Sequence, residues 1–209
     1  RAAADALCQA VAGELGQLAM DGAALSIRVQ PRSGDGALDA HGADDIAFLF
    51  TPFPGAEPMP MGASASGGEL SRLMLALELS AAGHGASGEQ GAPMTFIFDE
   101  VDAGVGGRTA VELGRRLARL ARHAQVIVVT HLPQVASWAQ RQYVVSKGTD
   151  GEGHTGTSVR EVQGGARVEE IARMLAGDTT RTSLDHAREL LDASRLDDDN
   201  TDAVAGGRA

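Results

Sequence analysis

Several features that would place this chain quickly in a class are scarce or missing. Its 209 residues include one cysteine, Cys8, which permits no internal disulfide and is typical of a reducing cytosol. We find neither a signal peptide nor an apolar run long enough to span a bilayer, so we expect a cytoplasmic location and no membrane partner. Aromatic residues make up only 3% of the chain, so the core should be built from Leu, Val and Ala.

Positive charge is also in short supply. The 18 Lys and Arg against 28 Asp and Glu give a net charge of −10. A main DNA-binding surface needs clustered positive charge to displace counterions, which argues against that role for this segment. The 43% apolar content supports a folded domain rather than disorder. Because the chain begins with Arg1 and not with Met, we expect it to be a piece of a longer protein.

The last absence concerns nucleotides, because the chain has no G-x-x-x-x-G-K-[ST] phosphate loop. It does have three other motifs, in the order in which an ABC-type ATPase uses them to bind and hydrolyse ATP. They are a glycine-rich helix start from Ser66 to Arg72, an apolar run ending in Asp99 and Glu100, and a second apolar run ending in His131. The chain therefore looks like half of an ATPase head.

Hydrophobic spacing places these motifs on regular elements. The segment from Met94 to Thr130 reads strand, helix, strand, which predicts a βαβ unit of a parallel sheet whose strands are buried on both faces. Residues 51–65 carry four prolines and are expected to form a loop. We expect helices over residues 2–20, 66–83, 108–122, 168–175 and 183–193, and further strands over 24–30, 46–51, 142–147 and 157–162.

The glycine-rich motif begins a helix. Ser66, with Glu69 three residues later, forms a capping box, which explains both residues without any ligand. Gly67 and Gly68 need another reason, because glycine in a helix costs about 0.5–1 kcal/mol. We expect them to let a phosphate approach the backbone N–H groups at the positive end of the helix. Arg72, one turn later, is expected to face a nucleotide, an acidic partner or solvent.

Asp99 and Glu100 follow a strand and lie at the carboxyl edge of the expected sheet, where open α/β sheets place their sites. Asp99 would suit Mg²⁺, and Glu100 would accept a proton from an attacking water. The alternative is that both acids simply begin a solvent-exposed loop. Without the neighbouring motifs the two interpretations are equally supported.

His131 and Asp102 are more ambiguous when each is taken alone. His131 follows the second strand, and a lone histidine there is usually a structural residue, whereas a functional one would contact the γ-phosphate or position the water. Asp102 could pair across an interface or stabilise its turn. The other histidines show no metal-ligand spacing. The order, spacing and placement of the three motifs agree, so the set is more specific than any member.

With these motifs the chain resembles, over nearly its whole length, the ABC-type heads of SMC-like proteins and in particular the RecN family. SGGELSR from Ser66 resembles the ABC signature motif. FIFDEVDAGVGG from Phe96 resembles Walker B running into the D-loop, and VTHLPQVA from Val129 resembles the His-switch region. IAFLFTPFPG from Ile46 and RVEEIARMLAGD from Arg167 resemble flanks of the RecN family that general ABC proteins lack.

The resemblance implies a fold class and a domain organisation. The fold is α/β, the C-terminal lobe of an ABC/SMC-type P-loop ATPase head, with a mainly parallel sheet flanked by helices. Residues 1–22 would be the end of a coiled-coil arm, residues 23–193 the lobe, and residues 194–209 a disordered tail. An N-terminal lobe of the same protein would carry Walker A, and without it this chain would be inactive.

The resemblance also implies partners and residue roles. Two copies of the head would sandwich two ATP molecules with Mg²⁺ and act in recombinational repair of DNA double-strand breaks, at the bacterial nucleoid, with DNA bound through other parts of the protein. The implied roles are Ser66, Gly67, Gly68, Glu69 and Asp102 in nucleotide binding, Asp99 at Mg²⁺, Glu100 as general base and His131 as the sensor of the γ-phosphate.

Two departures and two alternatives stay open. Ala65 stands where the general signature usually has Leu, and Gly106 stands where a typical D-loop ends in Asp, which puts coupling through that residue in doubt. One alternative function is the head of another SMC-like chromosome-organising ATPase. The other is a non-catalytic dimerisation module. Ser66, Asp99, Glu100 and His131 argue against the module, because a module without catalysis would have no chemical use for all four.

Overall fold

The computed structural model describes residues 1–34, 38–40, 42–64, 66–83, 94–149 and 155–196. The chain divides into two compact units, unit 1 (residues 1–135) and unit 2 (residues 136–209). Most of the expected tail over 194–209 lies outside the described residues. Among the residues described, no helix combines the length and the hydrophobicity needed to cross a membrane.

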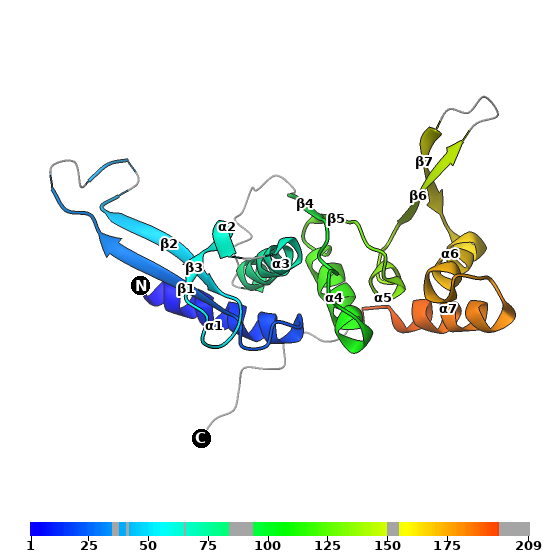
Figure 1. Ribbon diagram of the computed structural model, residues 1–209, viewed down its shortest axis with the longest axis horizontal. Coiled ribbons are helices and arrows are strands. Elements are labelled where there is room, and N and C mark those ends of the chain that lie inside the picture. Colours follow the sequence, from blue (N-terminus) through cyan, green and yellow to red (C-terminus); the bar gives the residue numbers. More distant parts are fainter. Residues whose placement is uncertain (35–37, 41, 65, 84–93, 150–154, 197–209) are drawn as a thin grey trace, which may run out of the picture. The chain divides into compact units, whose positions relative to one another are not determined.

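Unit 1 contains two small sheets and the helices that pack on them (Figure 1). Its elements are α1 (Ala2–Gln17), β1 (Ala24–Pro31), β2 (Asp44–Thr51), β3 (Met59–Pro60), α2 (Met61–Ser64), α3 (Gly67–Gly83), β4 (Thr95–Phe98), α4 (Gly107–Leu120) and β5 (Gln125–Val128), and the short helix α5 (Pro133–Ala136) follows at its end. The helices expected over 66–83 and 108–122 and the strands expected over 24–30 and 46–51 are confirmed, with ends that differ by a few residues.

The strand, helix, strand prediction is confirmed by β4, α4 and β5. The two strands pair in parallel from Thr95 opposite Gln125 to Phe98 opposite Val128. The Val129 N–H then donates to the Phe98 carbonyl at 3.0 Å, so the ladder continues to the point where each strand ends. The carboxyl ends of β4 and β5 therefore meet at one edge of the sheet.

The α/β class is confirmed, but fewer strands pair in parallel than the expected mainly parallel sheet implies. Among the described strands it is confined to β4 and β5, whereas β1, β2 and β3 form an antiparallel sheet. The parallel strands β4 and β5 are joined through the crossover helix α4, whereas no helix lies between β1 and β2 among the residues described there.

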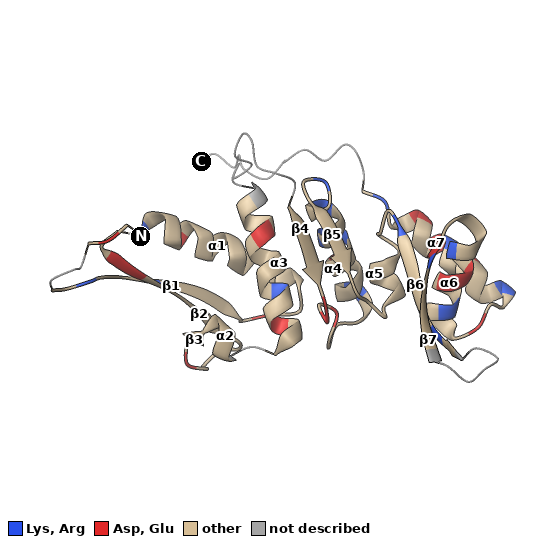
Figure 2. Ribbon diagram, turned by 90° about the horizontal axis from the view of Figure 1, so that it is seen from above, with Lys and Arg blue, Asp and Glu red and all other residues tan. Residues whose placement is uncertain are grey.

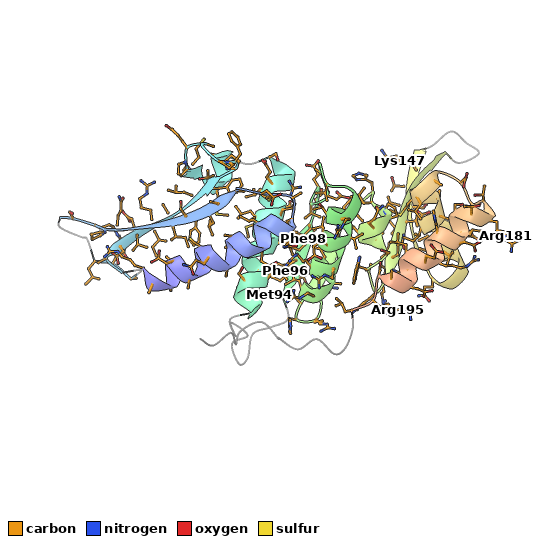
Figure 3. The ribbon with its side chains drawn as sticks, turned by 90° about the horizontal axis from the view of Figure 1, so that it is seen from below. Met94, Phe96, Phe98, Lys147, Arg181 and Arg195 are labelled. Atoms are coloured by element: carbon orange, nitrogen blue, oxygen red, sulfur yellow. The ribbon has the colours of Figure 1, made fainter. Side chains whose placement is uncertain are left out.

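The expectation that β4 and β5 are buried on both faces was wrong for this chain. Phe98 is buried and Phe96 partly so, and their rings stack at 6.4 Å along β4 (Figure 3). On the opposite face, Ile97 is 70% exposed and Ile127 is 46% exposed. The two strands have apolar side chains on both faces, which suits packing on both sides. Unit 1 covers the face that carries Phe98 and leaves the face with Ile97 and Ile127 exposed.

The core of unit 1 joins α1, the first sheet, α3 and α4. Burying an aliphatic or aromatic side chain of this kind stabilises a fold by about 1.5–3 kcal/mol. Helix α3 packs against both α1 and α4. It buries Leu73, Leu75 and Ala76, and α4 buries Leu113, Leu117 and Leu120. The fully or nearly fully buried members are Val11, Leu15, Leu18, Leu25, Phe50, Leu73, Leu75, Ala76, Phe98, Val101, Leu113, Leu117 and Leu120.

Unit 2 is a hairpin followed by a pair of helices (Figure 1). The strands expected over 142–147 and 157–162 pair antiparallel, from Gln142 opposite Val162 outward. Gly177, at φ +78°, ends the first helix in the left-handed conformation that glycine adopts most easily. The elements are β6 (Gln142–Thr149), β7 (Thr155–Val162), α6 (Gly164–Ala176) and α7 (Arg181–Ala193).

Candidate functional site

The beginning of α3 is closed by a capping box, as the sequence predicts. The Ser66 N–H and its hydroxyl both donate to Glu69 Oε2 at 2.9 Å, and the Glu69 N–H donates back to the Ser66 hydroxyl at 3.4 Å. These two hydrogen bonds from Ser66 lower the pKa of Glu69. The contacts of Ser66 and Glu69 are therefore accounted for within the helix.

Gly67 and Gly68 have a steric reason in the structure that the sequence did not suggest. A methyl group added at Gly68 would lie 2.9 Å from both the Glu100 carbonyl oxygen and the Ala103 Cβ. One added at Gly67 would lie 2.9 Å from Glu100 Oε2. The two glycines thus allow the first turn of α3 to lie directly against the loop that follows β4.

Two side chains of α3 hold that loop by its carbonyl oxygens. The Ser71 hydroxyl donates to the Asp99 carbonyl at 2.9 Å. Arg72 Nη1 donates to the Val101 carbonyl at 3.3 Å and to the Ala103 carbonyl at 2.7 Å. Arg72 was expected to face a ligand, a partner or solvent, and this was wrong. It is 7% exposed, and burial lowers the pKa of its guanidinium.

Asp99 and Glu100 are exposed at the end of β4, beside the start of α3. Acidic residues gather at this end of the strand in Figure 2. The Glu100 N–H donates to Asp99 Oδ1 at 3.0 Å. Glu100 has φ +56°, a left-handed conformation that a residue with a side chain rarely adopts. Strain of this kind is concentrated at functional sites, where the surrounding structure holds it.

Asp102 is buried and tied to the end of β5. It is 3% exposed, and its Oδ2 accepts hydrogen bonds from the Thr130 hydroxyl and, at 3.2 Å, from the His131 N–H. The same oxygen lies 3.3 Å from His131 Nδ1. The His131 side chain is otherwise 75% exposed. Asp102 therefore contacts its own chain, joins the loop after β4 to the loop after β5, and orients the imidazole.

The acidic residues suit a magnesium ion better than a metal held by protein ligands alone. In the described part of the chain, no group of three or more His, Cys, Asp or Glu side chains could hold a metal ion. Mg²⁺ commonly binds through one or two carboxylates together with waters and substrate phosphates. Asp99, exposed at the end of β4, could supply one such carboxylate.

A hollow of about 290 Å³ lies between α3 and β4. Its walls are largely apolar, and they continue the uncovered face that Ile97 presents. The lining residues are Leu70, Ser71, Met74, Glu78, Phe96, Ile97 and Phe98.

Sequence reasoning placed the acids, the histidine and the glycines at one site but missed the residues that hold them. Ser71, Arg72 and Thr130 make the connecting hydrogen bonds. The only available signal was their position next to motif residues. A partly buried ion pair of Arg116 in α4 with Glu14 in α1 was also missed, because the two residues lie far apart in the sequence.

Comparison with known proteins gives close relatives in sequence. The chain is 48% identical over 205 residues to the DNA repair protein RecN of Streptomyces coelicolor, which covers 93% of this chain and 35% of that protein. It is 47% identical to RecN of Mycobacterium leprae, covering 94% of this chain and 35% of the relative. For RecN of Treponema pallidum the identity is 41%, over 92% of this chain and 33% of the relative. The chain thus spans about a third of the length of these curated relatives.

No protein-family model matches the chain. Among solved structures, the Smc head domain with a coiled coil and joint from Pyrococcus yayanosii matches with a TM-score of 0.48 and 15% identity, over 91% of this chain and 29% of that one. The Smc head domain with an extended coiled coil from Pyrococcus furiosus matches with a TM-score of 0.47 and 17% identity, over 75% and 35%.

Proposed function

We propose that this chain, which belongs by sequence to the RecN family and spans about a third of its relatives' length, supplies half of a composite ATP-hydrolysing site in a DNA repair protein. The other half is a lobe that carries the Walker A phosphate loop, which this sequence lacks. Because the relatives are named DNA repair proteins, the work that we assign to the completed ATPase is recombinational repair of double-strand breaks.

One observation carries the proposal. Glu100 at the end of β4 lies against Gly67 at the start of α3, while Asp102, three residues after Asp99, orients His131 at the end of β5. A carboxylate that can accept a proton, a helix start that can approach phosphate and an oriented imidazole are thereby held by one framework. Phosphoryl transfer to water depends mainly on such positioning and on stabilisation of charge.

Each residue has a proposed part in hydrolysis. Glu100 accepts the proton of the attacking water, and an exposed carboxylate at the sheet edge can reach a bound water. His131 donates to the γ-phosphate through its other ring nitrogen, Nε2, since Nδ1 lies beside Asp102. Asp99 would hold Mg²⁺, which neutralises phosphate charge when bound. Ser66, Gly67, Gly68 and Glu69 form the helix start that approaches the nucleotide.

A second copy of the head is the proposed partner at this helix start. The signature residues Ser66 to Glu69 would face ATP held by the Walker A loop of the other copy, so that two nucleotides are shared between two heads. DNA would bind elsewhere in the protein, since the net charge of this chain is −10. Residues 1–22, which include α1, would form the end of a coiled-coil arm.

The uncovered face of β4 and β5 is the surface on which the missing lobe is proposed to pack. An exposed apolar surface next to a hollow is typical of a binding surface. Ile97 and Ile127 are the central residues of that face, and the hollow beside Phe96 continues it. Covering it would remove from water the residues that the sequence pattern marks as buried.

ATP hydrolysis by this chain alone, and after co-expression with the Walker A lobe, tests the proposal. We expect turnover only in the combined sample. The matched control is a lobe whose phosphate-loop lysine is replaced by alanine, which should abolish turnover while leaving the complex intact. A folded complex that binds ATP and does not hydrolyse it would instead support the non-catalytic dimerisation module.

A further inference from the structure

We propose that Ser71 and Arg72 are positioning residues for Glu100, which they hold in its left-handed conformation by fixing the loop from Asp99 to Ala103 on α3. The proposal rests on the hydrolytic role of Glu100 given above. Neither residue is expected to touch the substrate. Their effect on the reaction would pass entirely through the place and direction of the Glu100 carboxylate.

The hydrogen bonds fall on alternate residues of the loop. Ser71 donates to the carbonyl of Asp99, and Arg72 donates to the carbonyls of Val101 and Ala103. The carbonyl of Glu100, between them, accepts the Ala103 N–H at 3.0 Å and faces Gly68. The Asp102 carbonyl accepts the Val105 N–H at 3.1 Å, so every carbonyl from 99 to 103 has a contact with α3 or within the loop.

The conformation of Glu100 requires such support. At φ +56° its side chain crowds its own backbone, so the free loop would relax to another conformation unless its surroundings held it. The bonds on both sides of Glu100 prevent that relaxation. Removing the hydrogen bonds of Ser71 or of Arg72 would let the Glu100 carboxylate move while leaving it in place chemically. Such variants therefore test the position of the carboxylate separately from its presence.

The burial of Arg72 fits a structural task of this kind. The Arg72 side chain is in a residue only 7% exposed and has lost most of its hydration. Its Nη1 donates hydrogen bonds to the Val101 and Ala103 carbonyls of the loop. Its Nε has no hydrogen-bond partner among the described residues. Gly68 leaves space for the group, because a methyl there would lie 3.3 Å from Arg72 Nη1. The arginine is therefore committed to the loop and not to a ligand.

The test compares Ser71→Ala, Arg72→Ala and Arg72→Lys in the complete protein, formed from this chain and the Walker A lobe. Ser80→Ala is the matched control, because Ser80 lies on the same helix and donates to the Ala76 carbonyl of that helix instead of the loop. Steady-state kinetics give kcat and KM for ATP, and thermal unfolding reports the stability of each variant.

We expect Ser71→Ala to lower kcat by roughly 10-fold with little change in KM, since small misplacements of a catalytic group reduce rate and not substrate binding. Arg72→Lys should keep more turnover than Arg72→Ala, because the ammonium can still donate to a carbonyl. Ser80→Ala should leave kcat unchanged. In a Glu100→Gln background, Ser71→Ala should cause no further loss, because the group that it positions is already gone.

Three kinetic results for the loop variants would overturn the inference. They are an unchanged kcat in both Ser71→Ala and Arg72→Ala, a rise in KM without a fall in kcat, or an undiminished loss when Ser71→Ala is added to Glu100→Gln. If Ser80→Ala lowers kcat as much as Ser71→Ala, the effect comes from the helix in general and the inference also fails. Absence of hydrolysis by the unaltered complete protein would instead refute the proposed function, so the two failures are distinguishable.

Discussion

Replacing Gly68 by alanine tests the close contact between α3 and the loop after β4. Alanine in a helix is favoured over glycine by about 0.8–1.0 kcal/mol, so the change would stabilise an uncrowded position. At Gly68 the new methyl would lie 2.9 Å from the Glu100 carbonyl oxygen and from the Ala103 Cβ, and neither can rotate away. Overpacking of this kind typically costs about 1–3 kcal/mol. The expected net effect is a destabilisation of up to about 2 kcal/mol, because the cost of crowding offsets the gain in helix propensity.

Gly13→Ala is the matched control for this prediction. Gly13 is exposed within α1, and a methyl group there would meet nothing within 4 Å. This substitution should raise the free energy of unfolding by about 0.5–1 kcal/mol. Urea denaturation followed by circular dichroism measures both variants against the unaltered chain. If Gly68→Ala stabilised the chain as much as Gly13→Ala does, the close packing of α3 on the loop would be refuted.

The remaining predictions concern one position each. Gly67→Ala should leave stability nearly unchanged, because the methyl meets only the end of the Glu100 side chain, which can turn aside. It should lower kcat in the complete protein, because the carboxylate is then displaced. With Glu69→Gln, the free energy of unfolding should fall less steeply as the pH is lowered. The hydrogen bonds from Ser66 lower the folded-state pKa of Glu69 below its ordinary value. The contribution of Glu69 is therefore present above the unfolded-state pKa and lost as the pH falls through the folded-state pKa. Thr180→Ala should destabilise α7 by about 1 kcal/mol in urea unfolding, because the Thr180 hydroxyl accepts the Ser183 N–H at the helix start. An unchanged kcat, an unchanged acid profile or an unchanged midpoint, respectively, would contradict these three.

Regular spacing made the frame of the site predictable. The apolar runs before Asp99 and before His131, with an amphipathic helix between them, correspond to β4, α4 and β5. A parallel pair must bring its carboxyl ends to one edge, so the nearness of the two loops followed from the pattern. The capping box was predictable for the same reason, since Ser66 and Glu69 interact across a single turn.

The contacts that hold the site depend on tertiary packing, which the pattern does not contain. Arg72 is one turn into a helix in the sequence, and only the approach of the loop makes it a buried donor to Ala103. The glycines were interpreted through phosphate alone, because the closeness of Glu100 to Gly67 depends on how α3 lies against β4. The exposure of Ile97 was missed because a strand that is apolar on both faces does not say which chain covers each face.

The most direct test of the central claim is the turnover of the complete protein with Glu100→Gln. The glutamine keeps the size of the side chain and cannot accept the proton, so we predict a fall in kcat of about 10²–10⁴-fold. ATP-bound dimers of the variant should accumulate in light scattering, because binding is retained. Glu189→Gln, on the exposed surface of α7, is the control and should behave as the unaltered protein. Unchanged turnover in Glu100→Gln would contradict the assignment of Glu100 as the general base and, with it, the account of the site.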